Sequence, residues 1–358
     1  MSLPAPLTVR LVSALGRRTG AVGVAGRDAD QVRASRGPAR SRTARAVQAL
    51  VLGAPSPRVR VHRRATWSGV PVAVHTPPVV PGTVLPVVVH LHGGGWAQGG
   101  IDDTPWWVAA LAEALPAVVV SVGYRLAPEH PFPAAVDDCL EAVRWVAASP
   151  GAVGSGSRVR TDRVALVGDS AGANLAAVTS ARLRDEPLPG DPRVVHQGLV
   201  YPATDARLLT GSMAANAHAP VLGRADVDRF LELYTDGTGV DVEDPRLSPL
   251  LAASHAGLPP TTVLTAEHDP LRDDGRLYAE RLAAAGVRVR LTDYPGAVHG
   301  FLSLAGLDQV RSRQAVAELV AAIRPDLCGA PAGGPDDGPG GRPDGPTGLL
   351  SADVRADG

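Results

Sequence analysis

Ser170 is the residue whose surroundings most clearly indicate nucleophilic chemistry. It lies at the centre of the sequence GDSAG (168–172), after an apolar run at 163–167 and before an alanine-rich stretch. The apolar run predicts a short buried strand, and the alanine-rich stretch predicts a helix. A turn tight enough to expose a serine between them needs residues without a Cβ two positions before and after it, which Gly168 and Gly172 supply. The pattern therefore predicts a serine in strained backbone geometry with an exposed hydroxyl.

A serine hydroxyl needs a base to remove its proton and an acid to orient that base. Asp269 follows a predicted strand at 261–266, and His299 follows another at 287–294. Both would lie at the carboxyl ends of strands, where open parallel sheets place their sites. We expect Ser170, Asp269 and His299 to act together. Other carboxylates and imidazoles compete for the acid and base roles: Glu267, Asp273, Asp274, His268, His130 and His255.

Acyl transfer also needs donors for the oxyanion, and the sequence HGGGW at 92–96 follows a third buried strand. Glycines allow a backbone to approach a ligand closely. We expect Gly93, Gly94 and Ala171, the residue after the nucleophile, to supply the amides of an oxyanion hole. Trp96 is the predicted wall of the substrate pocket. Other aromatic residues are weaker candidates that core or cap packing explains as well: Trp106, Trp107, Phe230 and Tyr234.

Taken together, these motifs resemble the bacterial hormone-sensitive-lipase-like esterases. The resemblance extends to YRLAPEHPFPAA at 124–135 and covers about residues 58–325, although Gly123 and Ala173 depart from the usual pattern. It implies an α/β-hydrolase fold, with a mostly parallel central sheet flanked by helices and a helical cap. It further implies a serine carboxylesterase that cleaves short- to medium-chain acyl esters through an acyl-enzyme intermediate, with no cofactor and no metal. Because dimers are common in such families, we expect a homodimer.

Two alternatives stay open at this stage. Amide and ester cleavage share one triad, so an amidase or a specialised small-molecule deacylase fits the same residues. The second alternative, from a different class, is a non-catalytic small-molecule binding protein with a hydrolase fold. The presence of His299 argues against it.

Strand and helix signals alternate along most of the chain, which indicates a parallel sheet covered on both faces. Before the first strand, residues 1–57 contain helix formers, including a predicted helix at 44–52. Residues 205–239 interrupt the alternation, and we expect them to form the cap with this N-terminal segment. The core would end at residue 325. The remaining residues, 326–358, are rich in glycine and proline and predict a disordered tail.

The composition narrows the possible partners. A chain of 358 residues with a net charge of −1 has no global field that favours nucleic acid. No run of 18 apolar residues predicts a membrane span. The arginine-rich N-terminus fits a transit peptide or a segment that binds an anionic surface, although a solvated pair of amphipathic helices is the plainer interpretation. Two isolated cysteines, Cys139 and Cys328, fit a reducing compartment, so we expect a cytoplasmic protein.

Overall fold

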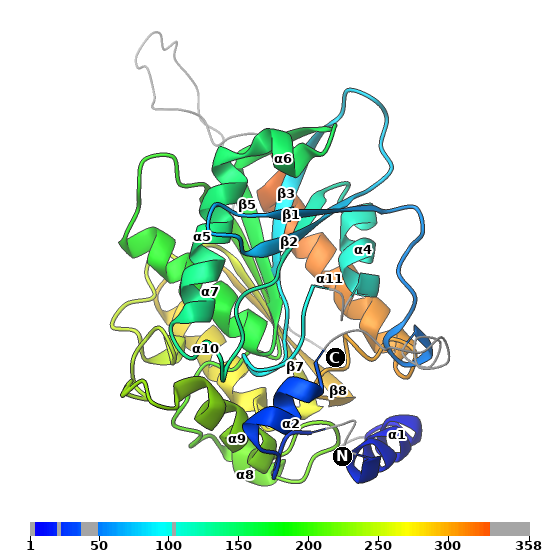
Figure 1. Cartoon of the computed structure of the whole chain (residues 1–358), viewed down its shortest axis with the longest axis vertical. Coiled ribbons are helices and arrows are strands. Elements are labelled where there is room, and N and C mark those ends of the chain that lie inside the picture. The colour runs from blue at the N-terminus through cyan, green and yellow to red at the C-terminus, as the bar shows by residue number, and fades with distance from the viewer. Residues whose placement is uncertain (1–3, 20–22, 37–48, 102–104, 330–358) are drawn as a thin grey trace, which may run out of the picture. The chain divides into compact units, whose positions relative to one another are not determined.

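One eight-stranded sheet organises the molecule (Figure 1). The computed structural model describes residues 4–19, 23–36, 49–101 and 105–329. The strands are β1 (Arg60–Ala65), β2 (Pro71–Thr76), β3 (Val84–Leu91), β4 (Val118–Val122), β5 (Arg158–Asp169), β6 (Arg193–Val200), β7 (Thr261–His268) and β8 (Val289–Val298). Their order is β1-β2-β4-β3-β5-β6-β7-β8. The pairs β1–β2 and β2–β4 are antiparallel and the other neighbours are parallel, so the predicted mostly parallel sheet is confirmed.

Helices cover both faces of this sheet. The helices of the described residues are α1 (Leu7–Thr19), α2 (Ala29–Ala34), α4 (Pro105–Ala114), α5 (Ala134–Ala148), α6 (Pro150–Gly154), α7 (Ala171–Asp185), α8 (Gly211–Ala215), α9 (Arg224–Thr235), α10 (Arg272–Ala284) and α11 (Gln309–Cys328), with a 3-10 turn η1 (Pro249–Leu251). Successive valines of β3 point to opposite faces. Val87 and Val89 belong to the apolar cluster with α5 and α7, whereas Val88 belongs to the cluster with α4 and α11. Continuous apolar strands are therefore buried on both sides.

The last helix extends further than the sequence predicted. We expected helix α11 to stop before Pro325, but it continues to Cys328. Leu327 is fully buried in the core, and its carbonyl accepts a hydrogen bond from the Arg160 guanidinium. Asp326 accepts a hydrogen bond from Nδ1 of His196 at 2.8 Å. These tertiary contacts outweigh the backbone hydrogen bond that a proline removes from a helix. Residues 330–358, where the disordered tail was predicted, lie outside the described residues.

The N-terminal segment packs against the insertion at 205–239. Ser13 of α1 accepts a hydrogen bond from the Val221 amide at 2.8 Å, and the Arg229 side chain of α9 donates to the Arg27 carbonyl at 2.9 Å. Figure 1 shows α2 beside α9 at the same end of the molecule. Of the helix predicted at 44–52, residues 44–48 lie outside the described residues, and residues 49–52 are helical.

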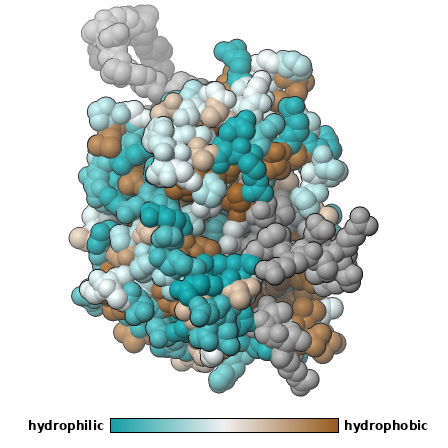
Figure 2. All heavy atoms as spheres, in the orientation of Figure 1, coloured by the Kyte–Doolittle hydropathy of each residue, from teal (hydrophilic) through white to brown (hydrophobic). Residues whose placement is uncertain are grey.

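Figure 2 shows one face of the molecule, on which polar and apolar residues are interspersed. Among the described residues, no helix has both the length and the apolar character that crossing a membrane requires.

Candidate active site

Ser170 lies at the sharp turn where β5 ends and α7 begins. Its backbone has φ 55° and ψ −121°, a conformation that costs free energy for a residue with a side chain. A Cβ on Gly172 would lie 2.0 Å from the Leu91 carbonyl oxygen, and one on Gly168 would lie 2.3 Å from the Gly172 carbonyl oxygen. Both glycines are therefore sterically required, as the sequence predicted, and the turn presents the serine side chain at the end of the sheet.

The structure brings Ser170, His299 and Asp269 together from three separate segments. The His299 Nε2 atom lies 3.0 Å from Ser170 Oγ, and its Nδ1 atom lies 2.7 Å from Asp269 Oδ2. Because a carboxylate can only accept, Nδ1 donates to Asp269 and Nε2 is free to accept the serine proton. Asp269 is fully buried, and its other oxygen accepts the Leu271 amide at 2.8 Å. The ring of Tyr201 packs against the imidazole of His299, with the ring centroids 4.7 Å apart.

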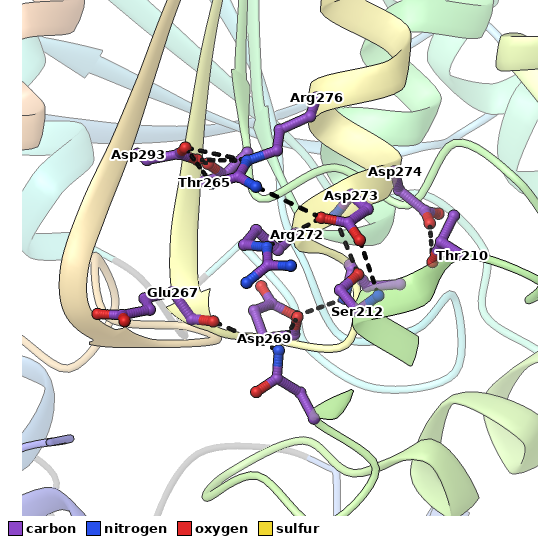
Figure 3. Close-up of polar contacts among 12 residues, drawn as sticks. Thr210, Ser212, Thr265, Glu267, Asp269, Arg272, Asp273, Asp274, Arg276 and Asp293 are labelled. Atoms are coloured by element: carbon purple, nitrogen blue, oxygen red, sulfur yellow. Dashed lines mark hydrogen bonds and ion pairs between the residues drawn. The ribbon is translucent and has the colours of Figure 1, made fainter. Parts of the chain in front are cut away.

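The rival acids are engaged elsewhere (Figure 3). The Glu267 carboxylate accepts the Gly296 amide at 2.6 Å. The Asp273 carboxylate accepts the Ser212 amide at 2.8 Å and pairs with an arginine beside it. Asp274 is fully buried and accepts two backbone amides from the segment that follows β6. None of these contacts orients the imidazole beside the nucleophile.

The rival histidines also lie away from the nucleophile. His255 is buried, and its Nε2 atom donates to the Pro249 carbonyl at 2.9 Å. His130 is exposed in the loop before α5. His268 lines a separate small cavity with residues 214–220.

The glycine loop at 93–95 corrects one sequence prediction. The Gly93 amide donates to Asp169 Oδ1 at 3.0 Å, so it is not available to an oxyanion. Within the described parts of the chain, the amides of Gly94, Gly95 and Ala171 have no acceptor, and all three residues line the cavity around Ser170. The Gly93 amide is thus engaged by the end of the neighbouring strand, and Gly94, Gly95 and Ala171 are the candidate oxyanion donors.

Asp169 and His92 hold this loop, and sequence reasoning missed both. The Asp169 carboxylate bonds the loop to the strand that carries the nucleophile. The His92 Nδ1 atom donates to the Gly93 carbonyl at 2.8 Å, and its ring stacks on Tyr124 at 4.2 Å. Burial lowers the pKa of His92 to about 4, so the ring is neutral at physiological pH. His92 lies in the sequence HGGGW and Asp169 in the sequence GDSAG, so their positions in these motifs were the sequence signal for this role.

A cavity of about 440 Å³ opens above Ser170. Its wall is mainly apolar and includes Trp96 and Phe230 of α9. Trp107 is instead fully buried in the core, and Trp106 donates its ring N–H to the Leu302 carbonyl at 3.0 Å. Tyr234 is buried behind Trp96 rather than on the cavity wall, as part of the packing that supports it. The described residues contain no group of three or more histidine, cysteine or acidic side chains placed to hold a metal ion.

Comparisons with known proteins agree with this architecture. Residues 88–303 match a family described as having the alpha/beta hydrolase fold. Carboxylesterase NlhH of Mycobacterium tuberculosis is 46% identical over 257 residues, which are 70% of this chain and 77% of that protein. An arylesterase of Saccharolobus solfataricus is 34% identical over 72% of this chain and 79% of its own length.

Solved structures of esterases superpose on most of the chain. An ester hydrolase from the metagenome of Lake Arreo has a TM-score of 0.76 and 34% identity, covering 90% of this chain and 99% of its own. The hyperthermophilic esterase of Pyrobaculum calidifontis has a TM-score of 0.74 and 33% identity, covering 90% and 98%. The chain therefore belongs to the hormone-sensitive-lipase-like family of α/β hydrolases and is a carboxylic ester hydrolase.

Proposed function

We propose that this hydrolase cleaves short- to medium-chain acyl esters through an acyl-enzyme formed on Ser170. The observation that carries the proposal is the unbroken chain from Ser170 Oγ through His299 to the buried Asp269, at the floor of an apolar cavity. The cavity volume of about 440 Å³ lies within the range of roughly 300–1,000 Å³ typical of small-molecule sites.

In the first half-reaction, His299 Nε2 takes the hydroxyl proton as Ser170 Oγ attacks the ester carbonyl carbon. Negative charge then develops on the carbonyl oxygen, and the amides of Gly94, Gly95 and Ala171 stabilise it. The protonated imidazole is stabilised by the Asp269 carboxylate 2.7 Å away. When the intermediate collapses, His299 gives its proton to the departing alcohol, and the acyl group remains on the serine.

In the second half-reaction, water replaces the alcohol. His299 removes a proton from the water, which attacks the acyl carbon, and the same donors hold the second oxyanion. Collapse of this intermediate releases the carboxylic acid and returns the proton to Ser170. All roles are filled by side chains and backbone amides of this chain.

The proposal assigns the cap to residues 1–57 together with the insertion at 205–239, over a core that continues through α11. Contacts between α1 and Val221 support this division, because Val221 also lines the cavity. The cytoplasmic location is likewise a proposal, supported by two free cysteines. A homodimer is proposed on family grounds, and sedimentation velocity would test it.

The test is hydrolysis of p-nitrophenyl esters from acetate to laurate by the wild type, Ser170→Ala and Ser303→Ala. Ser303 also lines the cavity and serves as the matched serine control. We expect turnover to peak at a short or medium chain, to fall about 10⁴-fold or more in Ser170→Ala, and to stay within about tenfold in Ser303→Ala. Unchanged turnover by folded Ser170→Ala would reject the nucleophile. No turnover of any ester by folded wild type would redirect the search to amides, narrow deacylation or ligand binding.

A further inference from the structure

Helix α9 presents one continuous face to the segments that surround the active site. Asp226, Phe230 and Tyr234 recur at four-residue intervals along it, so they lie on the same side of the helix. Each of the three contacts a different segment of the site's surroundings. The helix therefore joins the N-terminal segment at one end to the loop that carries the proposed oxyanion donors at the other.

Asp226 ties the N-terminal segment to the start of α9. Its carboxylate is 1% exposed and accepts four hydrogen bonds. Oδ1 accepts the amides of Val24 and Ala25 at 2.8 and 3.0 Å, and Oδ2 accepts the amide of Gly223 at 3.0 Å and the guanidinium of Arg17 at 2.9 Å. These donors lower the pKa of the carboxyl against the opposing effect of burial, so it is ionised at neutral pH. A single charge thus gathers two segments that lie about 200 residues apart.

One turn later, Phe230 lies directly on Gly95. A Cβ built on Gly95 would lie 2.2 Å from Phe230 Cγ, so the ring occupies the space that a side chain at this position would need. Gly95 also has a positive φ of 57°. The third glycine of the loop is therefore required twice, by its backbone conformation and by the close approach of the cap helix.

A further turn along, Tyr234 supports the next residue of the same loop. Its ring stacks on Trp96 with centroids 4.7 Å apart and planes 2° apart. Its carbonyl accepts the Phe132 amide at 2.8 Å, which fixes the end of α9 against the core. Two consecutive residues of the loop, Gly95 and Trp96, are consequently pressed by two consecutive turns of one helix.

We infer that Asp226 and Phe230 are positioning residues for the ester-hydrolysis reaction. Helix α9 couples the docking of the N-terminal segment on Asp226 to the position of the glycine loop at 93–95, the oxyanion loop. The inference rests on the proposed function, because it takes the Gly95 amide as an oxyanion donor. With residues 23–25 seated on Asp226, Phe230 holds Gly95 in place. If that seat is lost, α9 shifts and the Gly95 amide leaves the position where it stabilises the transition state. A misplacement of about 1 Å can cost about 10²-fold in rate.

The first experiment separates positioning from pocket lining. Phe230→Ala and Phe230→Tyr are compared for kcat and KM on p-nitrophenyl acetate, and for the Ki of an aryl trifluoromethyl ketone, whose serine adduct carries an oxyanion. We expect Phe230→Ala to lower kcat about 10- to 100-fold and to weaken the ketone by a similar factor. Phe230→Tyr, which keeps the ring, should retain both. A change in KM alone, with kcat and the ketone Ki unaltered, would show that Phe230 only lines the pocket and would overturn the inference.

The second experiment tests the coupling through α9. Asp226→Asn keeps the shape of the side chain but replaces one acceptor oxygen by a donor, so it faces two of the four donors with the wrong group. Asp228→Asn on the same helix is the matched control, since Asp228 is half exposed and pairs with Arg224 at 2.9 Å, one turn away. We expect Asp226→Asn to speed tryptic cleavage at Arg17 and Arg27 and to lower kcat about tenfold, and Asp228→Asn to do neither.

The double variant Asp226→Asn/Phe230→Ala decides whether the two effects share one route. If α9 transmits the seating, the kcat loss of the double variant will be smaller than the product of the single losses. If the kcat loss of the double variant equals the product of the two single losses, α9 does not couple the two residues and the inference fails. It also fails if Asp226→Asn is cleaved faster by trypsin in its N-terminal segment but keeps its kcat. Ser170→Ala keeps the two proposals apart: if it stays active, the proposed function fails, whereas an inactive Ser170→Ala beside a normal Phe230→Ala removes only this inference.

Discussion

Replacing Asp269 with asparagine tests the proposed triad through a single atom. Oδ1 of Asp269 accepts the Leu271 amide at 2.8 Å, and Oδ2 accepts the His299 Nδ1 proton at 2.7 Å. An asparagine has only one oxygen, and the Leu271 amide can only donate. That amide therefore selects the asparagine oxygen and leaves the NH₂ group facing His299. Nδ1 must then accept, so the ring proton moves to Nε2, which faces Ser170 and can no longer take its proton.

The size of the effect follows from the same contacts. Rotating the asparagine amide to restore the working tautomer would put its NH₂ against the Leu271 amide, at a cost of about 1–3 kcal/mol for unmatched buried donors. Losing the charged hydrogen bond to the imidazolium costs about 1.5–3 kcal/mol more. Together these costs are about 2.5–6 kcal/mol, which corresponds to a loss of about 10²- to 10⁴-fold in kcat.

The assay is kcat on p-nitrophenyl butyrate at neutral pH, normalised by active-site titration with a phosphonate ester. Glu267→Gln is the matched control, because a glutamine oxygen can still accept the Gly296 amide that Glu267 binds at 2.6 Å. We expect Glu267→Gln to keep kcat within about tenfold. A kcat for Asp269→Asn within tenfold of wild type, or a larger loss in Glu267→Gln, would refute the assignment of the acid.

Three further predictions concern stability. Burial lowers the pKa of His75 from about 6.5 in the unfolded state to about 4. Between these two values the unfolded state binds more protons than the folded state, so the free energy of unfolding falls as the pH drops from about 6.5 to 4. His75→Gln should flatten that fall by up to about 3 kcal/mol in urea unfolding, and an equally steep fall would contradict the assignment. Burial raises the pKa of Asp274 from about 4 to about 8. Between these values the folded state keeps a proton that the unfolded state loses, so the free energy of unfolding falls as pH rises. Asp274→Asn should therefore raise the free energy of unfolding at pH 8 by about 2 kcal/mol or more, and a loss would argue against the raised pKa. Gly172→Ala should lower the free energy of unfolding by about 3 kcal/mol or more, because its Cβ would lie 2.0 Å from the Leu91 carbonyl oxygen. Gly151→Ala is the control, since open space surrounds Gly151, and it should leave the melting temperature unchanged. Equal melting temperatures for the two variants would refute the steric argument.

The residues that carry the proposed chemistry could be identified from the sequence because each depends on local rules. Apolar runs predicted the strands that lead to Ser170, Asp269 and His299, although β5 begins at Arg158, before the expected run at 163–167. The elbow around Ser170 needs glycines at fixed spacing, so its sterics are written in five adjacent residues. Asp269 and His299 follow strands directly, and the carboxyl ends of parallel strands share one edge of the sheet.

Other features depended on partners that are distant in the chain. The Gly93 amide meets the Asp169 carboxylate only because β3 and β5 are neighbours in the sheet, and this pairing moves the proposed oxyanion donor from Gly93 to Gly95. Helix α11 passes Pro325 because the core buries Leu327. Phe230 reaches Gly95 only through the docking of the cap. Local patterns determine which elements form, because backbone sterics and hydrophobic periodicity act between near neighbours. Which amide remains free for the reaction is decided by contacts that exist only after the elements pack.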